Sequence, residues 1–134
     1  RDWSVTGVQT CALPIYGRVV AVYHHTHPAV LQLIKRVIDA GKAHNIPVSV
    51  CGEMAADTML AVLLLGLGLR QFSTAPSAIP ALKTALNRIT VEQANAVARE
   101  CMALLTVDEV DAKLEAAVHA ILGPEFTSRS TGGR

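Results

Sequence analysis

Apolar positions recur at steps of three and four residues along the first regular part of the chain. These positions are Val30, Leu31, Ile34, Val37 and Ile38. Steps of this length place side chains on one face of an α-helix, and Pro28 is a residue type favoured in the first helical turn. The pattern predicts an amphipathic helix over residues 28–44.

Two short runs that are rich in apolar and β-branched residues predict strands. The first, "IPVSV" at residues 46–50, has the continuous apolar character of a buried parallel strand and ends at Cys51 and Gly52. The second, "LRQFST", covers residues 69–74. Helices on either side of each strand give the spacing of parallel βα units, so we predict the α/β fold class.

The most apolar run of the chain, "MLAVLLLGLGL" at residues 59–69, lies between these strands. It is far shorter than the roughly 20 residues that a membrane span requires. It therefore predicts a buried helix and no membrane span. Asp57 is placed to cap this helix, which we expect over residues 57–66, and the glycines of "GLG" are expected to end it.

Three further helices are predicted after the second strand. "SAIPALKTALNRI", residues 77–89, carries Pro80 in its first turn. The capping boxes "TVEQ" and "TVDE" each place a threonine three residues before Gln or Glu, and they open helices over residues 91–104 and 107–121. The closing "GPEFTSRSTGGR", residues 123–134, has the small polar residues of a disordered tail.

Composition narrows the functional classes. The chain has 134 residues, 51% of them apolar, and a formal net charge of +1 without a basic face, which disfavours binding to nucleic acid or anionic lipid. Its cysteines, Cys11, Cys51 and Cys101, are widely spaced and form no CxxC pair, so neither a disulfide framework nor a zinc knuckle is expected. Unpaired cysteines suit a reducing compartment, and we predict a cytoplasmic protein.

The first residues stand apart from the rest. "RDWSVTGVQTCALPI" has neither a helical nor a strand period, and it lacks the basic start and apolar core of a signal peptide. It resembles translated sequencing-adaptor sequence, so we predict that residues 1–16 are not native to the protein. Trp3 and Cys11 are therefore excluded from functional interpretation.

Cys51 is the main candidate for chemistry because it stands where a strand gives way to a loop. Ligands of parallel sheets bind at the carboxyl ends of strands, and an ordinary thiol, mostly protonated at neutral pH, can donate a proton there. The alternative is a small buried apolar residue. Glu53, two residues further on, could tune or orient the thiol, or it could accept hydrogen bonds from loop amides.

Structural roles are expected for two other groups. The cluster "HHTH" at residues 24–27 suggests zinc or nickel, but adjacent histidines rarely converge on one ion, and no acid or cysteine stands at ligand spacing nearby. No metal site is predicted there. Cys101 lies on an amphipathic helix and is expected to be a packing residue.

Residues 27–83 closely resemble the C-terminal end of the phosphoenolpyruvate-protein phosphotransferases, the family of Enzyme I of the sugar phosphotransferase system and its nitrogen-related paralogue. The shared features are a His-Pro helix start at His27, the CGE motif at Cys51, an acid at Asp57, "LLLGLGL", and a strand with phenylalanine and serine that leads to "IP". Pyruvate phosphate dikinase and phosphoenolpyruvate synthase share the cysteine-glycine strand end, but their leucine-rich helix is less similar.

The resemblance implies that residues 17–89 are the last two βα units of a phosphoenolpyruvate-binding (β/α)8 barrel, an incomplete barrel followed by helices over residues 90–122. It also implies that Cys51 is the acid that protonates the enolate of pyruvate after the phosphoryl group has left. The magnesium ligands and phosphate-binding arginines of the family precede this segment. Mg²⁺ is thus implied for the intact enzyme, with ligands outside this chain.

The expected function is that of a C-terminal fragment of an enzyme that transfers phosphoryl from phosphoenolpyruvate to its own histidine and on to an HPr-type phosphocarrier protein, releasing pyruvate. The resemblance further implies a homodimer for the intact enzyme, and we expect the isolated fragment to be inactive. Two alternatives stay open: another phosphoenolpyruvate-utilising enzyme, of the pyruvate phosphate dikinase or phosphoenolpyruvate synthase type, and a non-enzymatic module whose terminal helices bind a partner. The sequence does not distinguish a sugar-uptake parent from a nitrogen-regulatory one.

Overall fold

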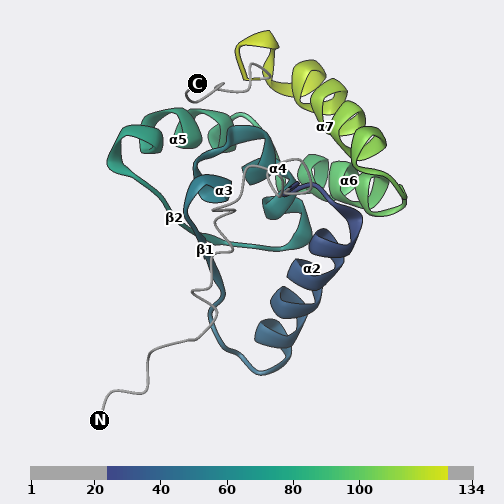
Figure 1. The fold of residues 1–134 in the computed structure, drawn as a ribbon. Coiled ribbons are helices and arrows are strands. Elements are labelled where there is room, and N and C mark those ends of the chain that lie inside the picture. The colour runs from purple at the N-terminus through teal and green to yellow at the C-terminus, as the bar shows by residue number, and fades with distance from the viewer. Residues whose placement is uncertain (1–23, 127–134) are drawn as a thin grey trace, which may run out of the picture.

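The computed structural model describes residues 24–126 of the chain (Figure 1). Its helices and strands, with η for a 3₁₀ helix, are α2 (Pro28–Ala43), β1 (Ser49–Cys51), α3 (Glu53–Ala56), α4 (Thr58–Leu67), β2 (Gln71–Ser73), η2 (Pro76–Ala78), α5 (Ile79–Asn87), α6 (Val91–Met102), α7 (Val107–Leu122) and η3 (Pro124–Phe126). The predicted order is confirmed, with the short helix α3 added after the first strand and residues 77–89 divided between η2 and α5. The segment predicted to be non-native, residues 1–16, lies outside the described residues.

The β1 and β2 strands form a two-stranded parallel sheet. The register pairs Ser49 with Gln71, Val50 with Phe72 and Cys51 with Ser73. Parallel neighbours need a crossover connection, which α3 and α4 supply between the two strands. The fold is therefore mixed α/β and mostly helical, which agrees with the predicted α/β class.

The strands are shorter and more exposed than the sequence predicts. The apolar runs predict buried strands over residues 46–50 and 69–74, but only three residues pair in each strand. The middle residue of each, Val50 or Phe72, is half-buried against the core, and the outer residues are exposed. Ile46 is 61% exposed. A parallel strand is buried when both faces of its sheet are covered. Within residues 24–126, other parts of the chain cover only one face of this sheet.

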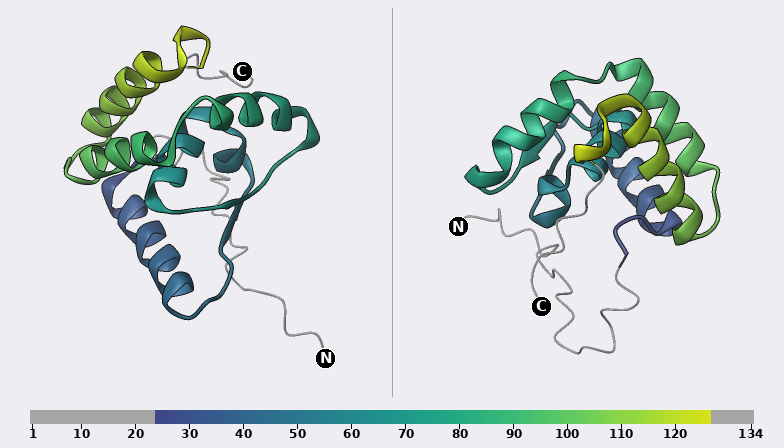
Figure 2. Two further views of the ribbon diagram at one scale, coloured as in Figure 1. Left: turned by 180° about the vertical axis from the view of Figure 1, so that it is seen from behind. Right: turned by 90° about the horizontal axis from the view of Figure 1, so that it is seen from above.

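Helix α4 lies at the centre of the described structure. It contacts α5, α6 and α7, which surround it in the views of Figures 1 and 2. Apart from the half-buried Leu65, its apolar residues are buried, as predicted: Met59, Leu60, Ala61, Val62, Leu63, Leu64 and Leu67. Because burying one large aliphatic side chain stabilises a fold by roughly 2 kcal/mol, this helix is the main anchor of the core.

Both ends of α4 are set by local residues. The Asp57 carboxylate accepts hydrogen bonds from the amides of Met59 and Leu60, at 2.8 and 3.0 Å, which confirms the predicted cap. At the other end Gly68 stops the helix in the left-handed conformation, with φ of 107°. Gly66, which the sequence also assigns to the helix end, lies inside α4 against α6. That assignment is wrong for Gly66.

Helices α6 and α7 begin with the two predicted capping boxes. The Thr90 hydroxyl accepts a hydrogen bond from the amide of Gln93 (3.2 Å), and the Thr90 amide donates to the Gln93 side chain (2.9 Å). Thr106 and Glu109 repeat this exchange at the start of α7. The two helices pack against each other and against α4, and α2 also contacts α6 (Figure 2).

The first residues of the predicted disordered tail are structured. The Arg88 guanidinium donates a hydrogen bond to the Glu125 carboxylate at 2.9 Å and lies 5.3 Å from the centre of the Phe126 ring. These contacts hold η3 against the end of α5, so the prediction of disorder is wrong for residues 123–126. Local composition does not reveal a partner as distant in sequence as Arg88. Residues 127–134 lie outside the described residues.

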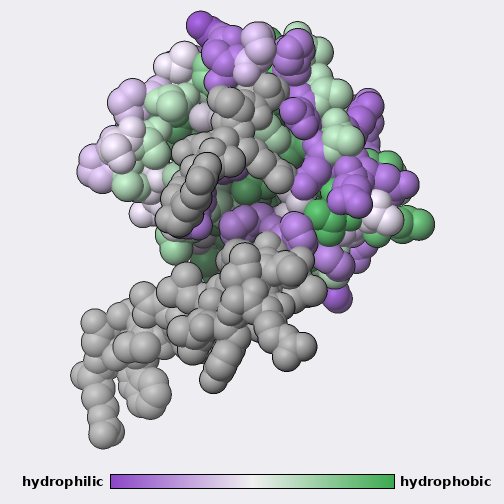
Figure 3. All heavy atoms as spheres, turned by 45° about the horizontal axis from the view of Figure 1, so that its top comes forward, coloured by the Kyte–Doolittle hydropathy of each residue, from purple (hydrophilic) through white to green (hydrophobic). Residues whose placement is uncertain are grey.

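Hydrophilic and hydrophobic residues are mixed on the surface of the described residues. In Figure 3 hydrophilic residues predominate in the upper and right-hand parts, and hydrophobic residues form smaller patches between them. Across residues 24–126, no helix combines the length and the apolar character that crossing a membrane requires.

Candidate functional site

Cys51 is the last residue of β1, and its side chain is exposed. Gly52 follows with φ of 79°, a conformation that residues with a side chain rarely adopt. A Cβ atom at Gly52 would meet no atom within 4 Å, so glycine is needed for its backbone conformation and not for space. The resulting turn ends the strand and leaves the thiol at the carboxyl end of the sheet. Within the described residues the thiol is exposed, and its two alternative roles, proton donor and packing residue, both stay predictions for the intact domain.

The structure shows no hydrogen bond between Glu53 and the thiol of Cys51. Glu53 is the first residue of α3, and its side chain is exposed. Within residues 24–126 its carboxylate makes no hydrogen bond or ion pair, so it neither bonds to Cys51 nor accepts hydrogen bonds from loop amides. A supporting role for Glu53 stays a prediction. Asp57 is the cap of α4, as the sequence predicts.

One face of the sheet carries polar side chains from both strands. Its exposed residues are Ser49, Cys51, Gln71 and Ser73. Because side chains alternate between the faces of a strand, these four lie on the face opposite Val50 and Phe72, which pack against the core. Cys51 and Ser73 pair at the carboxyl end of the sheet, and Ser49 and Gln71 pair at its other end. Sequence reasoning missed Ser73 because the register between the strands cannot be read from either strand alone.

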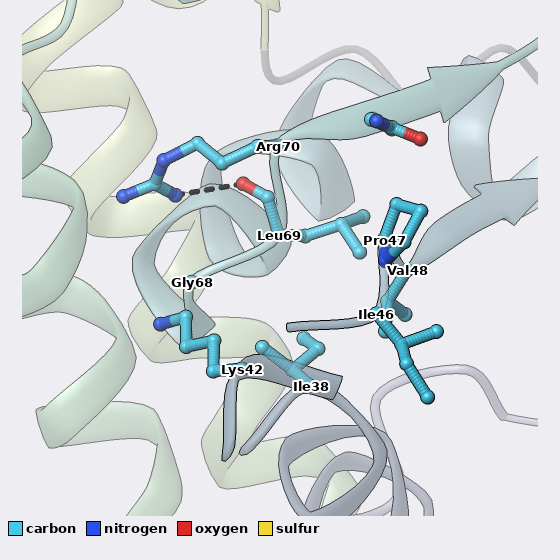
Figure 4. Close-up of a pocket in the computed structure, with 9 residues that line it drawn as sticks. Ile38, Lys42, Ile46, Pro47, Val48, Gly68, Leu69 and Arg70 are labelled. Carbon is cyan, nitrogen blue, oxygen red and sulfur yellow. Dashed lines mark hydrogen bonds between the residues drawn. The ribbon is translucent and has the colours of Figure 1, made fainter. Parts of the chain in front are cut away.

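A hollow of about 170 Å³ lies at the opposite, amino end of the strands (Figure 4). Its lining is mainly apolar and includes Lys42 and Arg70. The Arg70 guanidinium donates hydrogen bonds to the carbonyls of Leu65 (2.9 Å) and Leu69 (2.7 Å), and the Lys42 ammonium group lies next to Gly68. Cations at the C-terminal end of a helix are stabilising, so both side chains serve the end of α4. This hollow is separate from Cys51.

The described residues do not fit a metal ion. Residues 24–27 form a turn before α2, in which the His27 Nδ1 atom accepts a hydrogen bond from the Ala29 amide at 3.2 Å. His27 is thus the N-cap of α2, a role that its place before Pro28 could have suggested. Among residues 24–126 no three histidine, cysteine, aspartate or glutamate side chains gather as ligands. Magnesium, which the family resemblance implies, finds no ligand set among residues 24–126.

Cys101 is a core residue, in agreement with the predicted packing role. It lies in α6 and is 0% exposed. Burial raises the pKa of its thiol from 9.0 to about 11, with smaller opposing effects of Lys113 and Glu100. A thiol that stays protonated and buried is a poor nucleophile, so Cys101 is not a second reactive site.

This raised pKa gives the chain a stability that depends on pH. Between pH 9 and about 11 the folded state keeps a proton on Cys101 that the unfolded state loses, so the free energy of unfolding is intact below pH 9 and falls as the pH rises toward 11. Two pH units correspond to a loss of about 2–3 kcal/mol. We expect urea unfolding to show that the free energy of unfolding falls less between pH 8 and pH 11 for Cys101→Ala than for the unmodified chain. An equal fall in both chains would contradict the assignment of this pH dependence to Cys101.

Comparisons with known proteins place this segment in a family. Residues 16–91 match the family model described as "PEP-utilising enzyme, PEP-binding domain". Curated relatives named phosphoenolpyruvate-protein phosphotransferase include that of Haemophilus influenzae, 36% identical over 94 residues, and that of Bacillus subtilis, 35% identical over 93 residues. A relative of the same name from Cupriavidus necator is 46% identical over 65 residues.

The matches cover much of this chain and a small part of each relative. They include 70% and 69% of this chain for the Haemophilus influenzae and Bacillus subtilis proteins, and 16% of each of those proteins. For the Cupriavidus necator protein the shares are 48% of this chain and 11% of the relative. The family model spans more than half of the 134 residues, including Cys51 and Ser73. The chain therefore belongs to the phosphoenolpyruvate-utilising enzymes, of whose PEP-binding domain it forms a part.

Proposed function

We propose that this chain is the C-terminal part of the PEP-binding domain of a phosphoenolpyruvate-protein phosphotransferase, and that Cys51 donates a proton to the enolate of pyruvate. The single observation that carries the proposal is the exposed thiol at the carboxyl end of a parallel strand, in a segment that matches the PEP-binding family model. The curated relatives with the same name support the choice of enzyme within the family.

The uncovered face of the sheet supports an incomplete (β/α)8 barrel. In such a barrel, alternate strand residues face either the outer helices or the barrel interior, and the active site lies at the carboxyl ends of the strands. Val50 and Phe72 pack against the helices, whereas Cys51 and Ser73 are exposed on the other face. In the proposed barrel, that other face is the interior, and Cys51 lies at its active end.

The proposed step is a proton transfer from sulfur to carbon. Loss of the phosphoryl group from phosphoenolpyruvate leaves the enolate of pyruvate. The S–H bond of Cys51 then breaks, its proton forms a C–H bond at the methylene carbon, and the enolate oxygen becomes the carbonyl oxygen of pyruvate. The sulfur keeps the electron pair and the negative charge. In the reverse direction the thiolate removes a proton from the methyl group.

The rest of the proposed reaction belongs to the intact enzyme. Phosphoryl transfer requires positive groups that offset the charge on the phosphoryl oxygens, and this chain corresponds to 16% of its Haemophilus influenzae relative. Transfer to an enzyme histidine and to an HPr-type carrier, homodimer formation and a cytoplasmic location are parts of the proposal that rest on the resemblance. The isolated chain is expected to be inactive.

A chimeric enzyme tests the proposal. We expect the Bacillus subtilis relative to keep phosphoenolpyruvate-dependent phosphorylation of its own histidine and of its carrier when residues 17–122 of this chain replace its matching segment. The isolated chain should give no saturable heat with phosphoenolpyruvate and Mg²⁺ in calorimetry. The unmodified relative is the reference for activity, and thermal unfolding verifies that the chimera is folded. A folded but inactive chimera, or micromolar binding by the isolated chain, would contradict the proposal.

A further inference from the structure

The carboxyl end of the sheet brings a second functional side chain beside Cys51. Parallel pairing sets Ser73 directly opposite Cys51, and neighbouring strands lie about 4.8 Å apart. The middle residue of each strand faces the core and the outer residues are exposed, so Cys51 and Ser73 lie on the same face. A hydroxyl and a thiol thus stand at one level, at the end of the sheet where ligands bind.

The other pair on this face lies farther from the thiol, and its serine is two residues away along the same strand as Cys51. Ser49 and Gln71 precede Cys51 and Ser73 by two residues in their strands, which corresponds to about 6.6 Å along the sheet. Ser73 is therefore the hydroxyl best placed to reach the sulfur of Cys51. Ser49 offers a matched control, because it is also an exposed serine on the same face.

The Ser73 hydroxyl is available for this contact. Within the described part of the chain, neither its oxygen nor the sulfur of Cys51 makes a side-chain hydrogen bond to another group. A serine hydroxyl rotates freely and donates one hydrogen bond to the acceptor that attracts it most. A thiolate at the neighbouring position would be such an acceptor, since hydrogen bonds to charged groups are roughly twice as strong as neutral ones.

We infer that Ser73 is a positioning residue of the proton-transfer site, whose hydroxyl donates a hydrogen bond to the thiolate of Cys51. The inference rests on the proposed role of Cys51. As the S–H bond breaks and the proton passes to the enolate carbon, the Ser73 O–H turns to the sulfur that now carries the charge. The hydroxyl keeps its own proton throughout. In reverse, the same hydrogen bond holds the thiolate in place while it takes a proton from pyruvate.

Alkylation of Cys51 in the 134-residue chain tests this contact directly. Iodoacetamide reacts with the thiolate, and Thr and Val have nearly the same shape but differ by a hydroxyl. We expect Ser73→Thr to react at pH 7 at close to the unmodified rate and Ser73→Val about three- to tenfold more slowly, as the loss of one hydrogen bond predicts. At pH 10.5, above the ordinary range of thiol titration, the two rates should converge. Ser49→Ala should have no effect.

The measurement isolates Cys51 from the other thiols. Mass spectrometry follows the tryptic peptide that carries Cys51, which contains no other cysteine. Glu53, the nearest titratable side chain along the chain, is the same in every variant, and circular dichroism verifies that the variants keep the same helix content. Equal rates for Ser73→Thr and Ser73→Val at pH 7 would overturn the inference. An equal slowing by Ser49→Ala would also overturn it, because the effect would then belong to the whole face.

A kinetic comparison in the chimeric enzyme completes the test. Ser73→Val should lower kcat by about three- to tenfold with little change in KM for phosphoenolpyruvate, and Ser73→Thr should restore it. A change in KM alone would overturn the inference. The alkylation assay uses no phosphoenolpyruvate, so its result does not depend on the proposed enzyme activity. An inactive chimera with a clear Thr/Val difference would contradict the proposed function alone, whereas an active chimera without that difference would contradict the role of Ser73 alone.

Discussion

Replacing Cys51 with alanine in the chimeric phosphotransferase should lower the rate of phosphoryl transfer by about 10²- to 10⁴-fold, with little change in the affinity for phosphoenolpyruvate. Loss of a general acid removes help worth this factor, whereas the groups proposed to bind the phosphate lie outside this chain. The measurement is steady-state kinetics together with calorimetric binding of phosphoenolpyruvate. Because Cys51 is proposed to act in the chemical step and not in binding, the substitution should lower kcat and leave KM nearly unchanged.

Two further variants distinguish proton donation from packing. Cys51→Ser should restore little activity, because a hydroxyl is a far weaker acid than a thiol and would keep its proton. Ser49→Ala is the matched control, since it removes a polar group from the same strand and the same exposed face. It should transfer phosphoryl at close to the unmodified rate. If Cys51→Ser recovered most of the activity, size and packing at this position would matter more than acidity.

The facial selectivity of protonation gives the most direct readout. The substrate for this test is phosphoenolpyruvate that carries tritium at only one of its two methylene positions. In heavy water a fixed thiol should deliver deuterium to one face of the enolate, so pyruvate with a chiral methyl group of one hydrogen, one deuterium and one tritium is the expected product. Cys51→Ala should lose this selectivity, because the released enolate takes deuterons from either side in solution. Retained selectivity at a near-normal rate in the alanine variant would leave Cys51 without a part in the chemistry, and the exposed strand end would need another explanation.

The placement of Cys51 could be predicted from the sequence because it depends on one strand and one turn. The short apolar run and the glycine after it suffice to put the thiol at a strand end, and the positive φ of Gly52 explains why that residue is glycine. The neighbour of Cys51 could not be predicted in the same way. Which residue of β2 faces Cys51 depends on the register of the two strands, and no pattern within either strand reveals that register.

Helix starts depend on adjacent residues, whereas strand boundaries depend on distant parts of the chain. Asp57, Thr90 and Thr106 bond to amides two or three residues away, so each helix start is determined by a few adjacent residues and was predictable. The limits of a strand depend on which faces are covered by other parts of the chain. Ile46 is apolar and suited to a buried strand, yet it is 61% exposed and unpaired in the described structure, because pairing begins only at Ser49.

Gly66 was misassigned for the same physical reason. Read along the chain, the glycines of "GLG" mark a helix end, but only Gly68 has the left-handed conformation of a helix stop. Gly66 instead allows α6 to approach α4 closely: a Cβ atom added there would lie 2.6 Å from the backbone carbonyl carbon of Ala94 and 2.8 Å from the Cβ atom of Ala98. No local pattern reveals a neighbour that belongs to another helix.

This close approach predicts that Gly66→Ala lowers the free energy of unfolding by about 3 kcal/mol, at the upper end of the usual cost of overpacking. Helix propensity alone predicts the opposite sign, a gain of roughly 1 kcal/mol for alanine over glycine inside a helix. The contact decides the outcome because the nearest atoms belong to the Ala94 backbone, which cannot turn aside as a long side chain can. To make room, α4 and α6 must separate, and the buried apolar contacts between them weaken.

Urea unfolding of the full chain at pH 7 measures this effect as a shift of the midpoint at constant slope. Ala116→Gly, at an exposed position within α7, calibrates the propensity contribution and should cost about 1 kcal/mol. Combining Gly66→Ala with Ala98→Gly should not restore the stability, because the clash with the Ala94 backbone remains and glycine inside α6 adds a propensity cost of about 1 kcal/mol. A Gly66→Ala chain as stable as the unmodified one would mean that the helices lie farther apart than described.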